Sequence, residues 1–149
     1  MTFFLVPFLV YVLDRITKVL VVKNIVQDQS VALIPNIFHI TLVYNNGTAF
    51  GLFKDQNTPL LWLSLAVIIF IISYIWKKGR DTSWSISLSL GLILGGALGN
   101  LTDRIRLGYI IDFIDFRIWP VFNIADSAIT IGLIILAWKI LTKRCIQSS

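Results

Sequence analysis

Asp126 lies at the start of a strongly apolar stretch, within the segment FNIADSAIT at residues 122–130. A carboxylate inside a membrane costs on the order of several kcal/mol unless it is paired or hydrated, so such residues are functional candidates. Two carboxyl groups held close together cannot both ionise easily, and they share one proton. The ionised group can take a proton from an attacking water while the other donates to the carbonyl oxygen. A second aspartate near Asp126 would therefore allow peptide hydrolysis without a metal or a covalent intermediate.

The spacing of the aspartates does not determine which of them is the partner of Asp126. All eight acidic residues are aspartates, and the chain has one histidine, His39, and one cysteine, Cys145. This inventory excludes an HExxH zinc site and a zinc site with several cysteines, so no metal or cofactor is expected. The candidate partners are Asp112, Asp103, Asp115 and Asp14.

Two other mechanisms remain open from the residues alone. A Ser–Lys peptidase could use Lys18 with Ser127 or Ser30, provided that the pKa of the lysine is lowered. A proton- or ion-translocating membrane protein is the alternative outside enzymes, because acids in membrane helices also mark ion paths. A small monomer offers little room for alternating access, which argues against transport.

The composition is that of an integral membrane protein. Hydrophobic residues make up 56% of the 149 residues and charged residues 14%, against about 25% charged residues in soluble domains. We expect a mainly α fold with four transmembrane helices in a single membrane-embedded domain, residues 1–149. The net charge of +5 indicates loop topology rather than nucleic-acid binding. The predicted helices cover about residues 3–22, 58–76, 84–102 and 121–141.

Lysine and arginine residues in short connections predict the orientation of these helices. The connection at 77–83 contains three basic residues, and the tail at 139–144 contains three more. Both termini are therefore expected in the cytoplasm, and segments 23–57 and 103–120 on the outer side of the membrane.

The outer segments are not expected to be plain loops. Residues 38–45 alternate in polarity as a half-buried strand does, and residues 109–119 are rich in aromatic and β-branched side chains. Together they predict a small extracytoplasmic β platform. In the third helix, Gly91, Gly95 and Gly99 form a ridge of small residues that lets another helix approach closely.

In this topology, the polar residues of the helices gather near the outer face of the membrane. Several of them are three or four residues apart and share a helix face. Asp14 and Lys18 form one such pair, which is most simply a structural ion pair. The pairs are Asp14 with Lys18, Asn100 with Arg104, and Asn123 with Asp126.

Other acidic residues also have structural explanations. Asp103 can pair with Arg104 or Arg106 at the membrane interface. Asp126 can act as a helix cap. Asp115 is expected to be an ordinary solvated acid.

Four separated stretches of the chain form a characteristic set. They are DRITK (14–18), NNGTAFG (45–51), GGALGNLTDRIRLGYIIDFIDF (95–116) and FNIADSAITIG (122–132). Together they resemble bacterial lipoprotein signal peptidase, also called signal peptidase II. They span nearly the whole chain in the family's order, and the last two are highly specific. One departure is Thr48, which replaces the alanine usual in the second stretch.

This resemblance implies an aspartic intramembrane endopeptidase of the bacterial inner membrane, active near its outer face. The implied substrates are prolipoproteins that carry diacylglycerol on a cysteine. Cleavage on the N-terminal side of that cysteine releases the signal peptide. The protein is expected to be a monomer among membrane lipids, with no nucleic-acid partner.

The resemblance also implies roles for particular residues. The first aspartate of DFIDF, Asp112, and the aspartate of NIAD, Asp126, match the catalytic dyad. The family's outer segment forms a small β cradle around the substrate. Positions that line or support the site are Asn45, Asn100, Arg104 and Asn123. Further motif positions, assigned to support, are Asp14, Lys18, Gly47 and Asp103.

Overall fold

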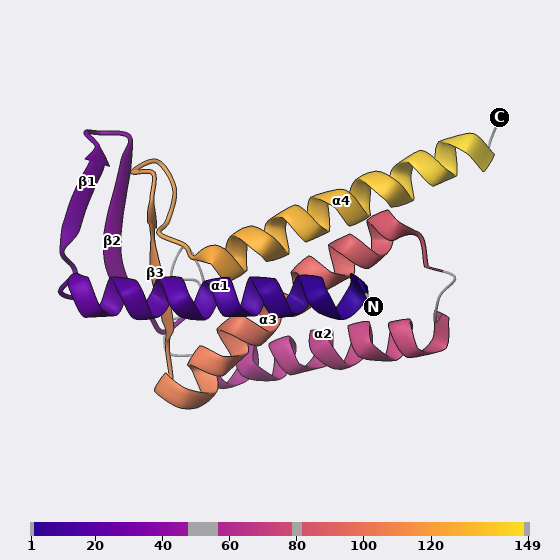
Figure 1. The fold of residues 1–149 in the computed structure, drawn as a ribbon, viewed down its shortest axis with the longest axis horizontal. Coiled ribbons are helices and arrows are strands. Elements are labelled where there is room, and N and C mark those ends of the chain that lie inside the picture. The colour runs from indigo at the N-terminus through magenta and orange to yellow at the C-terminus, as the bar shows by residue number, and fades with distance from the viewer. Residues whose placement is uncertain (1, 48–56, 79–81, 148–149) are drawn as a thin grey trace.

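The fold places a small antiparallel sheet at one end of a group of long helices. The computed structural model describes residues 2–47, 57–78 and 82–147. The elements in chain order are α1 (Thr2–Asn24), β1 (Ser30–Ile34), β2 (Phe38–Asn45), α2 (Asn57–Lys78), α3 (Trp84–Leu107), β3 (Ile110–Asp115) and α4 (Ile124–Gln147). The N-terminal end of α1 and the C-terminal ends of α2 and α4 lie on the side away from the sheet (Figure 1).

The helices are apolar enough for a membrane protein. Among the described residues, α2, α3 and α4 are long and apolar enough to cross a membrane. Helix α1 has 23 residues, but Asp14, Arg15 and Lys18 interrupt its apolar sequence. The mainly helical class with a small sheet is therefore confirmed, and the count of four transmembrane helices stays a prediction.

Helix α3 packs against each of the other three helices. The predicted glycine ridge is its contact surface for α1. A Cβ atom at Gly95 would lie 2.7 Å from Cβ of Val10, and one at Gly99 would lie 2.7 Å from Oδ2 of Asp14. Both distances are shorter than real Cβ contacts, so the absence of side chains is what allows the two helices to approach.

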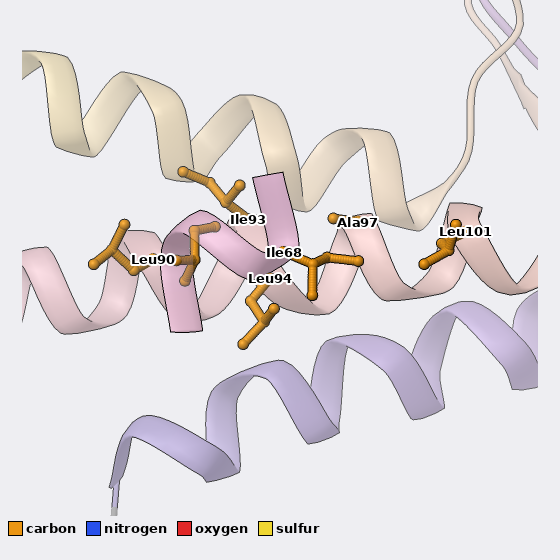
Figure 2. Close-up of a cluster of buried hydrophobic side chains, with 7 residues drawn as sticks. Ile68, Leu90, Ile93, Leu94, Ala97 and Leu101 are labelled. Carbon is orange, nitrogen blue, oxygen red and sulfur yellow. The ribbon is translucent and has the colours of Figure 1, made fainter. Parts of the chain in front are cut away.

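The contact between α2 and α3 is mainly apolar (Figure 2). Ile68 and Ile71 of α2 pack against a row of α3 side chains that includes Leu90, Leu94 and Leu101. Large apolar side chains on the outer surfaces of the helices remain exposed, as expected of helices that face lipid.

The sheet has the order β1–β2–β3, and both strand pairs are antiparallel. Strand β2 covers Phe38–Asn45, the residues predicted from alternation, and β3 lies within the aromatic segment 109–119. Val43 pairs with Asp112, and Asn45 with Ile110. This register brings the end of β2 beside the first candidate carboxyl group.

Helix α3 is longer than its sequence pattern predicts. It continues to Leu107, so Asp103 and Arg104 belong to the helix and not to the outer segment predicted for 103–120. Gly108, with a φ of 82°, ends the helix and donates its N–H to the carbonyl of Arg104. The last turns of α3 thus carry polar residues beside the sheet.

Candidate active site

Strand β3 carries Asp112 on a face that lines a cavity. Successive strand residues point to opposite faces, so Asp112 shares this face with Ile110. Asp112 is only 2% exposed. Its Oδ2 accepts a hydrogen bond from Nδ2 of Asn45 at 2.8 Å, and its Oδ1 accepts one from Nδ2 of Asn123 at 2.7 Å.

Asp126 lies in the first turn of α4, where it has a structural role as well. The N–H of Asn123 donates to Oδ2 of Asp126 at 3.2 Å, and the N–H of Asp126 donates to Oδ1 of Asn123 at 2.9 Å. This reciprocal pair is a capping box. It starts the helix at Ile124, later than the predicted residue 121. Asn123 is therefore the N-cap residue and Asp126 its partner three residues later, so Asp126 contributes to capping without being the cap that was expected, and this contribution does not exclude a chemical role.

Two asparagine amides connect the carboxyl groups. Nδ2 of Asn100 donates to Oδ1 of Asp126 at 2.7 Å, and Nδ2 of Asn123 donates to Oδ1 of Asn100 at 3.2 Å. Because Asn123 also donates to Asp112, hydrogen bonds run from one aspartate to the other. The structure thus brings together four of the predicted site residues.

The pKa of Asp112 is raised, as expected of a carboxyl group that shares a proton with Asp126. Burial raises the pKa of Asp112 to about 7, and the negative charge of Asp126 adds to the increase. The hydrogen bonds from Asn45 and Asn123 act in the opposite direction, because they stabilise the ionised carboxylate. A raised pKa of this kind allows the pair of carboxyl groups to keep one proton near neutral pH.

Both carboxyl groups line one cavity of about 720 Å³. Asn45, Gly47 and Arg104, which the sequence indicated as site residues, also line it. Arg104 donates to Oγ of Ser64 on α2 at 3.3 Å, and the N–H of Gly47 donates to Oδ1 of Asn45 at 2.9 Å. Thr48, the departure from the family pattern, lies outside the described residues.

One wall of this cavity was not identified from the sequence. It is the segment between β3 and α4, where Arg117 turns the chain with a φ of 65°. Phe116 stacks on Phe38 and Phe122, with ring centroids 5.1 and 6.0 Å apart. The aromatic run at 109–119 was the available signal, but sequence alone did not show that it would enclose a cavity. The wall consists of Phe116, Ile118, Trp119, Pro120, Val121 and Phe122.

A cluster of charged residues joins α1 to α3 outside this cavity. The ion pair predicted between Asp14 and Lys18 is present, with Nζ 3.0 Å from Oδ2. The predicted pairing of Asp103 with Arg104 or Arg106 is wrong. Asp103 instead pairs with Lys18 at 2.7 Å and with Arg15 at 2.6 Å.

The correction for Asp103 follows from helix geometry. Consecutive residues of an α-helix point about 100° apart, so Asp103 points to α1 while Arg104 points to the cavity. Asp14 extends the cluster toward α4, since its Oδ1 accepts the N–H of Ala125 at 3.2 Å. The cluster therefore holds the start of α4, immediately before Asp126.

The expectation that Asp115 is a solvated acid is also wrong. Asp115 is buried, and its carboxylate accepts hydrogen bonds from Oγ1 of Thr41 at 2.7 Å and from the N–H of Arg117 at 2.8 Å. Asp115 is three positions after Asp112 along β3, so the two side chains point to opposite faces. Asp115 is not among the residues that line the cavity.

The Ser–Lys alternative finds no support in the described contacts. Lys18 is 1% exposed, and its ammonium group contacts two carboxylates and Oδ1 of Asn100. Ser127 donates to the carbonyl oxygen of Asn123, and Ser30 bonds with His39 and Thr41 on the sheet. Each candidate serine is thus engaged away from Lys18.

The fold and the site define a class of protein: a membrane protein with a buried and a partly buried carboxyl group, those of Asp112 and Asp126, on one cavity. Comparisons with known proteins narrow this class. The family model described as signal peptidase (SPase) II matches residues 6–142. The chain therefore belongs to the signal peptidase II family, as its motifs predicted.

Individual relatives agree with the family. The lipoprotein signal peptidase of Halothermothrix orenii is 43% identical over 139 residues, which are 91% of this chain and 94% of that protein. That of Moorella thermoacetica is 43% identical over 141 residues, covering 95% and 93%. A solved structure of a bacterial membrane enzyme superposes with a TM-score of 0.89 at 31% identity, covering 96% of this chain and 89% of the other.

Proposed function

We propose that this chain is an aspartic endopeptidase that removes signal peptides from prolipoproteins carrying diacylglyceryl-cysteine. Membership of the signal peptidase II family and the names of the relatives support the substrate class. The observation that carries the mechanism is the pair of carboxyl groups, Asp112 and Asp126, on one cavity and linked by amides.

In the proposed reaction, the proton begins on Asp112 and Asp126 is the base. Two donors face the carboxylate of Asp126 in this role, Nδ2 of Asn100 and the backbone N–H of Asn123. Asp126 removes a proton from water as the water attacks the peptide carbonyl, and Asp112 protonates the carbonyl oxygen. Collapse of the tetrahedral intermediate then breaks the C–N bond. Asp126 passes the proton it took from water to the departing amine of the cysteine, and Asp112 takes back a proton from a hydroxyl of the intermediate.

The cavity suits a substrate that remains anchored in lipid. Its wall includes Phe116, Ile118 and Trp119, which supply apolar surface near the acyl chains. Each buried methylene contributes roughly 0.8 kcal/mol to membrane binding, so an enzyme that meets the bond at the membrane surface avoids extracting the lipid. We assign Arg104 to orienting a substrate carbonyl, since this residue lines the same cavity.

The proposed topology places both termini in the cytoplasm of a bacterium and the sheet on the outer side of the inner membrane. The basic residues Lys77 and Lys78 lie at the end of α2 away from the sheet, which agrees with the cytoplasmic preference of lysine. The protein is proposed to act as a monomer.

The test compares cleavage of lipidated and unlipidated precursors by the wild type and by the Asp112→Asn and Asp126→Asn variants. Each variant is expected to lose at least about 100-fold in kcat, because general acid–base groups contribute roughly that factor or more. Asp115→Asn is the matched control, since it alters a buried aspartate of the same strand outside the cavity. Near-normal cleavage by either dyad variant would refute the mechanism, and equal cleavage of both precursors by the wild type would refute the substrate class.

The same variants separate the proposal from proton or ion transport. Vesicles that contain the wild-type protein are expected to show no proton flux above that of empty vesicles. A flux that disappears in Asp126→Asn vesicles would favour the transport alternative.

A further inference from the structure

A second cavity lies on the opposite face of β3 from the candidate active site. It has a volume of about 290 Å³ and is formed between α1 and α3. Ile111 lines this cavity, whereas its neighbours Ile110 and Asp112 line the larger one. This division follows from the alternation of side chains along a strand. The two cavities are therefore separate sites with β3 between them.

The second cavity has more positive than negative charge. Arg15 and Lys18 line it, and Asp14 and Asp103 neutralise these two cations through ion pairs. Two further lining cations, Lys23 and Arg106, are exposed. Within the described part of the chain, neither Lys23 nor Arg106 forms an ion pair with a carboxylate. The cavity thus has two positive charges that no described acid balances.

Helix length places these cations at the depth of lipid headgroups. The 24 residues of α3 extend about 36 Å, which exceeds a hydrocarbon core of about 30 Å. Arg106 is next to last in α3, and Lys23 is next to last in α1. Both therefore lie at the sheet end of the helices, where α3 leaves the hydrocarbon.

The rest of the lining is apolar and open to lipid. Val19 and Val22 of α1 and Leu107 of α3 line the cavity, and each is at least 40% exposed. Apolar side chains below a cationic rim match the two parts of a phospholipid, its acyl chains and its phosphate. Basic pockets between membrane helices bind lipid headgroups in this way.

We propose that this cavity binds the headgroup phosphate of an anionic phospholipid, held by Lys23 and Arg106. The two unbalanced cations favour an anionic lipid over a zwitterionic one, whose headgroup cation they would repel. The acyl chains lie along Val19 and Val22. Because the lipid contacts both α1 and α3, its binding stabilises their contact. The proposal is independent of the proposed peptidase activity.

The experiment measures lipid binding to the purified full-length chain in a neutral detergent by native mass spectrometry, with melting temperature as a second measurement. Phosphatidylglycerol and phosphatidylcholine of equal chain length are titrated, and inorganic phosphate is added as a competitor. The double variant Lys23→Gln/Arg106→Gln is compared with Lys77→Gln/Lys78→Gln. The control pair has the same charge change at exposed positions on the end of α2 away from the sheet.

The wild type is expected to bind phosphatidylglycerol more tightly and to melt at a higher temperature with it. The Lys23/Arg106 variant is expected to bind it about 30-fold more weakly, because each cation near a charged lipid surface contributes about fivefold. The Lys77/Lys78 variant keeps the wild-type affinity. Equal losses in both variants, or no preference for the anionic lipid, would overturn the proposal. Displacement of the lipid by millimolar inorganic phosphate would show a site for free phosphate instead.

Discussion

Replacing Asn45 by alanine is expected to move the pH dependence of cleavage toward higher pH. Nδ2 of Asn45 donates to Oδ2 of Asp112 at 2.8 Å, and this hydrogen bond lowers the pKa of Asp112 against the effect of burial. The proposed reaction requires protonated Asp112, so activity falls as pH rises through its pKa of about 7. Without the hydrogen bond, Asp112 remains protonated to a higher pH, and activity persists there.

The size of the shift follows from the strength of the bond. A hydrogen bond to a charged group contributes about 1.5–3 kcal/mol, and the bond that remains to the neutral acid is weaker. A difference of about 1.4 kcal/mol between the two forms corresponds to about one pH unit. The alkaline limb of the profile should therefore move from about pH 7 toward about pH 8.

The assay is kcat/KM for a lipidated precursor between pH 5 and pH 9, since kcat/KM reports the ionisation of the free enzyme. Asn24→Ala is the matched control, because the Asn24 amide donates to the carbonyl of Leu20 on an exposed part of α1. Asn45→Ala also removes the hydrogen bond from the N–H of Gly47 to Oδ1 of Asn45. A local disturbance from this loss would lower kcat/KM at every pH and would leave the alkaline limb of the profile in place. An alkaline limb that stays in place, or moves to lower pH, would refute the assignment of the proton to Asp112.

Three further outcomes are expected. Gly99→Ala should lower the melting temperature, because its Cβ would meet Oδ2 of Asp14 and overpacking costs roughly 1–3 kcal/mol; an unchanged value would show that α1 can move away from α3 there. Asp103→Asn should destabilise the protein by about 3 kcal/mol in denaturant unfolding, because it leaves buried Lys18 with one carboxylate partner; a loss below 1 kcal/mol would contradict this role. EDTA should leave cleavage unchanged, and loss of activity restored by a metal ion would refute the metal-free mechanism.

Sequence patterns identified the elements that have strong local signals. The alternation at 38–45 predicted β2, because a strand with one buried face needs that period. The small residues of α3 predicted a close helix contact, and the structure shows that the helix in this contact is α1. The motif positions of Asp112 and Asp126 were also enough to propose a pair, and the structure has both on one cavity.

Side-chain contacts between segments far apart in the chain could not be predicted from these local patterns. The partner of Asp103 depends on which side of α3 packs against α1, and Arg15 lies 88 positions earlier in the chain. The burial of Asp115 depends on the pairing of β2 with β3, which places Thr41 within hydrogen-bond distance. Local spacing gives neither contact, because both arise only when the sheet and the helices pack together.

The direction of the Asn100 amide shows how α1 influences the candidate site. Its Oδ1 accepts from Nζ of Lys18 and from Nδ2 of Asn123, each at 3.2 Å, and its Nδ2 donates to Asp126 at 2.7 Å. Rotating the amide by 180° would place two donors, Nδ2 and the ammonium, against each other and an oxygen against the carboxylate. Lys18 therefore fixes which end of Asn100 meets Asp126. Since Asp14 and Asp103 hold Lys18, an ion cluster outside the cavity determines that Asp126 receives a hydrogen-bond donor.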